Sequence, residues 1–543
     1  MFGHMLASTS APERATRAVA RSTRGMVASP HALATAEGVR VLRDGGNAVD
    51  AAIATNGVLA AVYPQANGLG GDAFWMVYEP RTGDVVCYNG SGRAPQALQA
   101  AFLRERGYAE VPPRSAFAVT VPGAVRAWED VAKAHGTRGL DSLLEAGHRY
   151  ARDGYVVTEV VAYYLALNEQ ILAQCPYASA MFLRNGLPEA GDVLVNAGLA
   201  KTMTDVRTGG ADAFYGGSAG RAIVERLKAA GSPIELEDLV AHRTQITQPW
   251  RLPWADGEVL SHPPNSHGSC AQIVFGALER DRGADEGLWA HLAIEAFKHA
   301  FWIRDTRFGD PDFVTLPQAD VLGAAALREI RRRIDPQRVT AQFRRPGSGD
   351  TIALVTADEE GRAVCLIQSL YMNFGSGIVA GESGVVLQNR GAYFNLIEGH
   401  PNELRGGRRP VHTLSPAMYV RDGKPELVYG TMGGDGQPQI HVQLLHGIYD
   451  RGLDVQTAID APRWIAGRPH VPGREDAMTD TVVLESRMTE EVVSALERRG
   501  HRTELLGAYD HTMGHAQAIR IDRERGTFSG GSDSRADSLA LGF

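Results

Sequence analysis

The chain has 543 residues, enough for two to four ordinary domains or for one unusually large layered domain. Its hydrophobic content of 44% and charged content of 22% are typical of a soluble globular protein, and its formal net charge of −8 argues against nucleic acid or an anionic membrane as the main partner. It contains no run of about 18 apolar residues, so we expect no transmembrane helix.

The cysteines and the N-terminal segment indicate the cellular compartment of the protein. The cysteines are widely separated and include no CxxC pair, so we expect free thiols rather than a disulfide scaffold or a zinc site; they are Cys87, Cys175, Cys270 and Cys365. The first 24 residues carry arginines among Ser, Thr and Ala and lack the apolar core of a secretory signal. We therefore expect a flexible N-terminus at 1–24 and a cytoplasmic protein, with a periplasmic or secreted protein as the alternative if a signal has been removed.

In the first part of the chain, helical patterns alternate with loops marked by Gly and Pro. Residues 29–44 predict a helix that stops at Gly45-Gly46, and residues 48–62 predict a helix so rich in small residues that we expect it to be buried between layers. Residues 73–92 predict two strands joined by a turn. Residues 289–310 predict an amphipathic helix.

The pattern changes after residue 350. Residues 351–369 predict a β-hairpin that begins at Thr351. Further on, 425–434 predict a strand that ends in a glycine turn, 438–452 and 489–500 predict helices, and strands within 515–533 close the chain. Helices and antiparallel hairpins occur in blocks, which favours an α+β fold of stacked layers over βαβ alternation.

Two motifs suggest chemistry that their context does not support. GLGGDA at 68–73 matches the glycine pattern of dinucleotide-binding folds, but a strand follows it where a helix is needed, so we expect a tight buried turn. The histidines lack the spacing of an HExxH zinc site, and we expect loop or core positions rather than metal ligands for His501, His511 and His515. We expect neither a metal nor a cofactor.

Thr351 carries the catalytic hypothesis. It follows the flexible run GSGD and opens the predicted hairpin. A threonine hydroxyl is a weak nucleophile without an adjacent base, and no Asp-His pair lies near it in the sequence. Cutting the Asp350–Thr351 bond would free the α-amine of Thr351, which can then act as the base for the threonine's own hydroxyl.

Two further segments offer groups suited to acyl transfer. A strand that ends at Gly433-Gly434 just before a helix exposes backbone N–H groups able to hold an oxyanion, which is worth about 3 kcal/mol per donor. The alternative for this pair is an ordinary strand-to-helix turn. His412 and Thr413 lie in a polar loop, and Arg93 is a cation able to bind a carboxylate, although a single loop arginine is usually solvated.

Together these segments resemble the γ-glutamyltransferase family of N-terminal-nucleophile hydrolases. The matching blocks follow the family's order from about residue 25 to the C-terminus: DGGNAVDAAIA, YPQANGLGGDAF, EAFKHAFWIRDTRFGDPDF, GDTIALVTADEEGRAV, FGSGIVAGESGVVLQN, SPAM, MGGDGQP and GSDSRADSLALGF. The chain is most similar to a bacterial branch that carries NGSGRAP and LQNRG, related to cephalosporin acylases and oxamate amidohydrolase.

The resemblance implies a four-layer αββα fold made as one precursor, without a cofactor. The precursor would cut itself into a large chain, 25–350 after the flexible N-terminus, and a small chain, 351–543, which together form one folded unit able to assemble as a homodimer. The family's nucleophile matches Thr351, its helper hydroxyl matches Ser369, and its oxyanion-hole glycines match Gly433 and Gly434.

The substrate positions depart from the family pattern. An Asn, a Gln and an Asp that hold the α-amine of a γ-glutamyl donor become Tyr371, Arg390 and Tyr393, two phenols and a cation that would repel an ammonium group.

The carboxylate site departs as well. Its paired serines become His412 and Thr413, and Ser91 occupies the position of its arginine, with Arg93 two residues further on. A pocket with two arginines still suits an acyl group that bears a carboxylate.

Three functions are consistent with the sequence. We favour a self-processing amidohydrolase that acts on a small amide whose acyl part ends in a carboxylate. The second is a γ-glutamyltransferase or glutathione hydrolase, and the third is an unprocessed relative that binds or scaffolds without catalysis. The intact Thr351, Ser369 and Gly433-Gly434 weigh against the third.

Overall fold

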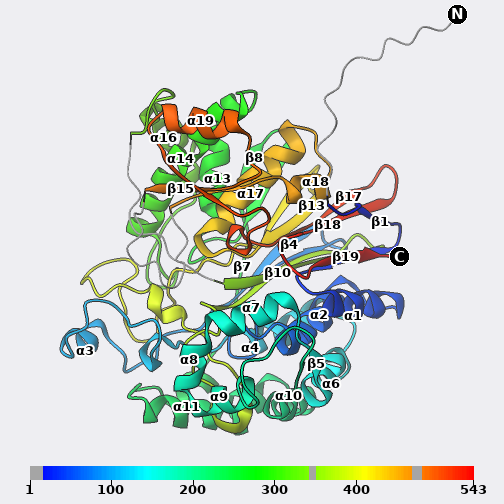
Figure 1. Ribbon diagram of the computed structural model, residues 1–543, viewed down its shortest axis with the longest axis vertical. Helices are drawn as coiled ribbons and strands as arrows, with labels where there is room; N and C mark the ends of the chain where they lie inside the picture. The colour runs from blue at the N-terminus through cyan, green and yellow to red at the C-terminus, as the bar shows by residue number, and fades with distance from the viewer. Residues whose placement is uncertain (1–15, 341–349, 468–479) are drawn as a thin grey trace, which may run out of the picture.

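The computed structural model describes residues 16–340, 350–467 and 480–543. Two seven-stranded sheets stack at its centre, with helices above and below them in Figure 1. Three separate cores fill the spaces between these layers. This is the expected α+β architecture of four αββα layers.

The first sheet, called here the nucleophile sheet, contains the strand that carries the candidate nucleophile, Thr351, as its second residue. Neighbouring strands in it are antiparallel. Its order is β19 (Leu539–Gly542), β2 (Gly25–Ser29), β10 (Asp350–Asp358), β11 (Ala363–Tyr371), β3 (Asp72–Glu79), β4 (Asp84–Gly90) and β7 (Gln245–Thr247).

The second sheet is antiparallel throughout and packs against the first. Its order is β1 (Ala20–Ser22), β18 (Thr527–Ser532), β17 (Ala516–Asp522), β13 (Lys424–Thr431), β12 (Ala417–Arg421), β9 (Gly257–Ser261) and β8 (Trp250–Trp254). Apolar side chains of both inner faces, such as Phe74, Ile367 and Val428, form the core between the sheets.

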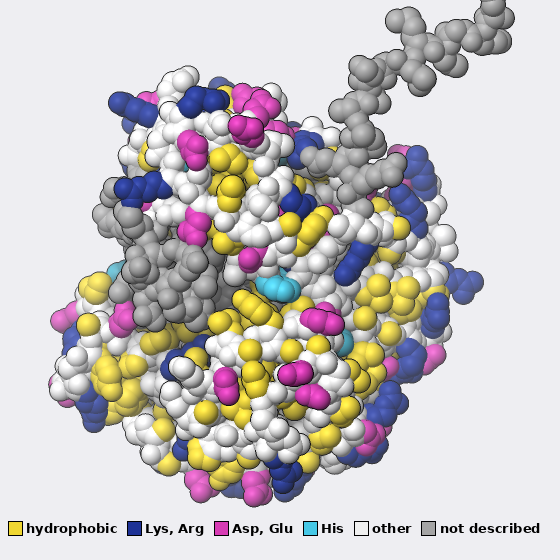
Figure 2. Space-filling model, viewed as in Figure 1, with side chains coloured by type: hydrophobic (Ala, Val, Ile, Leu, Met, Phe, Trp, Pro, Cys, Tyr) yellow, Lys and Arg dark blue, Asp and Glu magenta, His cyan; other side chains and the backbone are white. Residues whose placement is uncertain are grey.

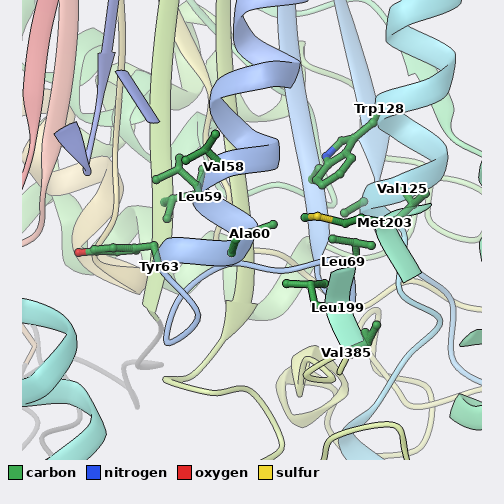
Figure 3. Packing of buried hydrophobic residues seen from close by; sticks show 14 of the residues in the cluster. Val58, Leu59, Ala60, Tyr63, Leu69, Val125, Trp128, Leu199, Met203 and Val385 are labelled. Atoms are coloured by element: carbon green, nitrogen blue, oxygen red, sulfur yellow. The ribbon is translucent and has the colours of Figure 1, made fainter. Parts of the chain in front are cut away.

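Helix α2 (Ala48–Val62) lies between the nucleophile sheet and an outer set of helices. Asn47 and Asp50 form a reciprocal capping box at its start, and every one of its residues is buried. The small side chains permit this burial on all faces. Figure 3 shows Val58 and Leu59 of this helix, and Tyr63 directly after it, in the same core as Trp128 and Met203. The surrounding helices are α1 (Ala32–Arg43), α4 (Ala124–His135), α6 (Glu145–Asp153) and α10 (Ala197–Tyr215).

The second sheet is covered by α13 (Ser269–Ala277), α14 (Glu286–Arg307) and α17 (Gln437–Leu445). We expected an amphipathic helix at 289–310, but α14 is buried on most of its surface because α13 packs on one side and α19 (Glu490–Arg498) on the other. The predicted hairpin at 351–369 is confirmed as β10 and β11, and the predicted helix at 48–62 coincides with α2.

Shorter elements complete the fold. They are α3 (Ala100–Arg104), α5 (Leu140–Leu143), β5 (Tyr155–Val156), α7 (Glu159–Leu167), α8 (Glu169–Gln174), α9 (Pro176–Phe182), β6 (Val193–Leu194), α11 (Ser218–Ala229), α12 (Leu236–Val240), α15 (Ala319–Leu322), α16 (Ala324–Arg333), α18 (Val455–Asp460), β14 (Trp464–Ala466), β15 (Thr481–Glu485) and β16 (Arg502–Leu506). Single turns include η4 (Arg390–Tyr393), η5 (Gly434–Gly436) and η7 (His511–Met513).

The cysteines and the N-terminal segment can be compared with the expectations from the sequence. All four cysteines are buried free thiols. The N-terminus was expected to be flexible up to residue 24; its last part, Ala20–Ser22, pairs with β18 as strand β1. Among the described residues, no helix is long and apolar enough to cross a membrane. Acidic and basic side chains both occur across the face in Figure 2.

Candidate active site

Thr351 lies at the start of β10, in the middle of the nucleophile sheet. The pairing of β10 with β11 is irregular between Asp350 and Ile352, so Thr351 occupies a local bulge in the ladder. Its Oγ1 is 3.2 Å from Ser369 Oγ, within hydrogen-bonding distance. The candidate nucleophile and its candidate helper are thus in contact across neighbouring strands, and both are buried.

Ser369 is held by the end of β11. Its Oγ accepts a 2.7 Å hydrogen bond from the Tyr371 N–H, and Tyr371 has a φ of 78°, a left-handed conformation that is strained for a bulky residue. On the opposite face of β11, the Gln368 carboxamide oxygen accepts hydrogen bonds from Asn56 and Trp128. These contacts fix the strand behind Ser369.

The Gly433-Gly434 turn follows β13, and β13 itself packs over β10. A Cβ placed on Gly430 would lie 3.4 Å from the Ala353 Cβ, so β13 passes directly over the strand that carries Thr351. Gly433 has a φ of 131° and Gly434 a φ of 53°, a pair of conformations that glycine adopts readily. Within the described residues, neither N–H donates to a protein acceptor. The turn therefore offers two backbone donors.

Arg390 is the main cation of the pocket. It is 1% exposed, its guanidinium lies 3.8 Å from the centre of the Tyr371 ring, and one Nη donates a 2.8 Å hydrogen bond to Thr413 Oγ1. In the described part of the chain, its Nε and other Nη have no hydrogen-bond partner. A buried N–H without a partner costs about 1–3 kcal/mol, so these donors are suited to a ligand anion.

Asp435 joins the glycine turn to the pocket. Its Oδ1 accepts hydrogen bonds from Arg304 at 2.8 Å and from the Tyr393 hydroxyl at 3.2 Å. The Tyr393 ring in turn lies 6.0 Å from the Tyr371 ring. Burial raises the pKa of Tyr371 to about 12 and that of Tyr393 well above its usual value, so both phenols stay neutral.

Arg93 and His412 are already engaged by the protein. Arg93 forms ion pairs with Asp310, at 3.0 Å, and with Asp312. His412 Nε2 lies 3.1 Å from Asp72 Oδ2, and burial holds the pKa of His412 well below its usual value. Arg93 therefore has carboxylate partners where Arg390 has open donors.

Sequence reasoning missed Asp72, Arg304 and Asp435. All three stand in segments that were singled out, GLGGDAF, the helix around 289–310 and MGGDGQP. The glycine-rich segments were interpreted as turns. The sequence does not show which residue a carboxylate or guanidinium in these segments would pair with in the fold. A charged residue inside an otherwise apolar, glycine-rich block is the signal that could have identified them.

Of the histidines considered as metal ligands, His501 lies apart, whereas the His511 and His515 rings are 5.7 Å apart. His501 Nε2 is 2.8 Å from His291 Nδ1, whereas His511 stacks on Tyr163. Among the described residues, no cluster of three or more His, Cys, Asp or Glu side chains could hold a metal ion. A cavity of about 90 Å³ between α14 and α17 is lined by none of the candidate site residues.

Asp350 is the other half of the predicted cleavage site. It forms the first residue of β10, and the backbone runs on from it into Thr351 within that strand.

Comparisons with known proteins identify the family of the chain. Residues 34–543 match the gamma-glutamyltranspeptidase family. The chain is 38% identical to the glutathione hydrolase-like YwrD proenzyme of Bacillus subtilis, over 96% of this chain and 99% of that protein. It is 34% identical to the oxamate amidohydrolase proenzyme of Klebsiella pneumoniae, again over 96% and 99%.

A solved structure gives the same result for the fold. The cephalosporin acylase from Bacillus halodurans superimposes with a TM-score of 0.90 at 32% identity and covers 99% of both chains. The match extends through both sheets and all four layers. This chain therefore belongs to the gamma-glutamyltranspeptidase family and is an enzyme of the N-terminal-nucleophile hydrolase class.

Proposed function

We propose that the chain is a precursor that cuts itself between Asp350 and Thr351 and then hydrolyses a small amide whose acyl part carries a carboxylate. The products of cutting are the chains 1–350 and 351–543. Thr351 is 1% exposed in the continuous chain, so cutting precedes substrate binding in this scheme.

The two reactions use the same hydroxyl. In maturation, Thr351 Oγ1 attacks the Asp350 carbonyl, the acyl group moves from nitrogen to oxygen, and water hydrolyses the ester. In turnover, the freed α-amine of Thr351 takes the hydroxyl proton as Oγ1 attacks the carbonyl of the substrate amide. The α-amine then gives this proton to the amine of the substrate, which leaves as the C–N bond breaks. Water then hydrolyses the acyl-enzyme. Ser369 positions Oγ1, and the Gly433 and Gly434 N–H groups stabilise the oxyanion in both steps.

The observation that carries the substrate proposal is the pair of open donors on Arg390. A carboxylate accepts strong, charge-assisted hydrogen bonds from a guanidinium, and the buried Nε and one Nη of Arg390 have no protein acceptor in the described residues. Arg93 lies in ion pairs with two aspartates, so the proposal assigns the acyl carboxylate to Arg390 first. Thr413 orients the guanidinium, and Tyr371 and Tyr393 form its aromatic wall.

The names of relatives support this substrate class without choosing one member of it. Oxamate, the substrate named for one relative, is an amide that bears a carboxylate, and another relative is named a cephalosporin acylase. Other relatives are named glutathione hydrolases, which makes γ-glutamyl transfer or hydrolysis the second candidate.

One observation favours that second candidate. Asp435 places a carboxylate beside Tyr393, at the edge of the pocket, where an α-amine could approach it. The Arg304 guanidinium already donates to this carboxylate, which reduces its attraction for a second cation.

The test compares three p-nitroanilides that differ in one group. Glutaryl-p-nitroanilide has the carboxylate, γ-glutamyl-p-nitroanilide adds the α-amine, and butyryl-p-nitroanilide has neither charge. We expect the largest kcat/KM for the glutaryl compound. Faster turnover of the γ-glutamyl compound would establish the second candidate. Equal turnover of the butyryl and glutaryl compounds would show that the enzyme does not recognise the acyl carboxylate.

A further inference from the structure

Asp72 and His412 form a buried acid–base pair beside the nucleophile. Asp72 is the residue of β3 directly opposite Ser369 on β11. Side chains of directly opposed residues project to the same face of a sheet, so the Asp72 carboxyl shares the inner face with the Ser369 hydroxyl. Asp72 and His412 are each 1% exposed or less.

The contacts of the pair are specific. Asp72 Oδ1 accepts hydrogen bonds from the N–H groups of Gly92 and Gly123 at 3.1 and 3.2 Å, and Oδ2 lies 3.1 Å from His412 Nε2. His412 Nδ1 faces the Leu414 N–H at 3.4 Å. Because Nδ1 accepts from the Leu414 N–H, the unprotonated pair holds one proton on His412 Nε2, which donates to Asp72 Oδ2. A second proton can bind at Nδ1 in place of the Leu414 contact, and the shared proton can then reside on either Nε2 or Oδ2.

The pair lies next to Arg390. Gly70 and Leu387 form a parallel bridge, and the Gln388 N–H donates a 3.0 Å hydrogen bond to the Gly70 carbonyl, so the segment that leads to Arg390 runs beside the segment that leads to Asp72. Thr413, which follows His412, accepts the hydrogen bond of Arg390. No described carboxylate forms an ion pair with Arg390 within 4.0 Å. Burial lowers the pKa of Arg390, and Tyr371 and Asp72 are among the groups whose charge opposes this shift.

We propose that the Asp72–His412 pair takes up one proton from solvent when an acyl carboxylate binds Arg390, so that binding of the anionic acyl group is coupled to protonation. This inference rests on the proposed function, because it requires the acyl carboxylate to occupy the open donors of Arg390. A second negative charge beside Arg390 disfavours the Asp72 carboxylate, and a proton on the pair relieves that repulsion.

Among the described side chains around the pair, none has a pKa near neutral; in the processed enzyme the freed α-amine of Thr351 is the other group that titrates in this range. Burial raises the pKa of Asp72 to about 7, opposed by Arg390. Burial lowers the pKa of His262 to about 4 and that of His267 well below its usual value, and it raises the pKa of Tyr215. The charged and titratable groups that face Asp72 and His412 are Arg390, Arg409, Tyr215, His262 and His267.

The sign of the effect follows from linkage. Below about pH 7 the pair already holds its proton in the free enzyme, so binding of an anion is independent of pH. Above that pH the proton must be taken up on binding, so affinity falls as pH rises, by at most about tenfold per pH unit. A neutral acyl group adds no charge beside Arg390, so its affinity should not fall as pH rises.

The first measurement uses the processed wild-type enzyme and glutarate, a dicarboxylate without an amide. Competitive inhibition by glutarate is measured from pH 6 to 9, and calorimetry at pH 8 in phosphate and in Tris gives the protons taken up per glutarate bound. We expect an inhibition constant that is flat below pH 7 and rises about 3–10-fold by pH 8.5, with about 0.5–0.8 proton taken up at pH 8. Butyramide, the neutral control, should show neither effect.

The second measurement uses Asp72→Asn. The carboxamide oxygen introduced by Asp72→Asn can still accept from the Gly92 and Gly123 N–H groups, but the carboxamide cannot take up a proton. Glutarate inhibition of this variant should therefore be independent of pH, and its proton uptake should vanish. Asp84→Asn, on the exposed start of β4 in the same sheet, is the matched control and should behave as wild type.

The possible outcomes distinguish failure of the proton coupling from failure of the proposed carboxylate site. Competitive inhibition by glutarate without proton uptake or pH dependence overturns the coupling and leaves the carboxylate site standing. Proton uptake that persists in Asp72→Asn would assign the proton to the α-amine of Thr351 and would also overturn the proposed coupling to the Asp72–His412 pair. Failure of glutarate to bind at any pH contradicts the proposed function itself. The wild-type arm decides the matter if a variant does not fold.

Discussion

The candidate nucleophile and the proposed acyl pocket are built in different ways. Thr351 and Ser369 lie on neighbouring strands at the centre of a sheet, and the hydrogen-bond ladder sets the distance between them. Arg390 and Thr413 come from the long connection between β11 and β12, and side-chain contacts hold them in place. The reaction is thus fixed by the sheet, whereas recognition can change with a connecting segment while the sheet stays the same.

This contrast predicts two kinds of kinetic defect. A change at the nucleophile end should lower kcat for every substrate, because it removes an interaction made in the transition state. A change in the acyl pocket should affect only substrates that carry the carboxylate.

The larger effect is expected at the glycine turn. Gly433→Ala places a side chain at a φ of 131°, which costs about 1–3 kcal/mol and rotates the two N–H donors away from the oxyanion. We expect kcat to fall about 100-fold for glutaryl- and butyryl-p-nitroanilide alike, with KM changed little. Steady-state kinetics with both substrates checks this.

A matched control separates strain from oxyanion binding. Gly423→Ala also substitutes a left-handed glycine, with a φ of 73°, in the turn between β12 and β13, where its Cβ meets no atom within 4 Å. This variant should lose stability and keep its kcat. An equal loss of kcat in both variants would show that backbone strain, rather than the donors of Gly433-Gly434, governs the rate.

The smaller effect is expected at the two arginines. Arg390→Met keeps the apolar stem and removes the charge-assisted hydrogen bonds, so kcat/KM for glutaryl-p-nitroanilide should fall about 10–100-fold and that for the butyryl compound should stay within about twofold. Arg93→Gln disrupts ion pairs with Asp310 and Asp312 and should change kcat/KM by less than about threefold. A larger loss in Arg93→Gln than in Arg390→Met would reverse the assignment of the carboxylate.

The sequence predicted the nucleophile end of the site better than the pocket. Hydrophobic alternation and turn residues placed the hairpin at Thr351, and the register of that hairpin brings Ser369 to the threonine. The family resemblance supplied the roles of these residues. Local pattern and motif are sufficient here because the two residues belong to one hairpin.

The pocket could not be predicted in the same way, because its contacts join distant segments. Asp72 and His412 are 340 residues apart, and Arg304 and Asp435 are 131 apart. Arg93 and Arg390 are both arginines in polar loops of the sequence, and only the folded chain shows that the first is paired with aspartates and the second has open donors. Pairing of buried charges is a property of the tertiary structure.

The most direct test of the account is mass spectrometry of the purified protein. We expect two chains, 1–350 and 351–543. After brief reaction with glutaryl-p-nitroanilide and an acid quench, we expect one acyl group on the peptide that begins with Thr351. Thr351→Ala should give one uncut chain without activity. A single uncut chain that hydrolyses the substrate, or an acyl group on any other residue, would contradict the claim that Thr351 is the nucleophile of both reactions.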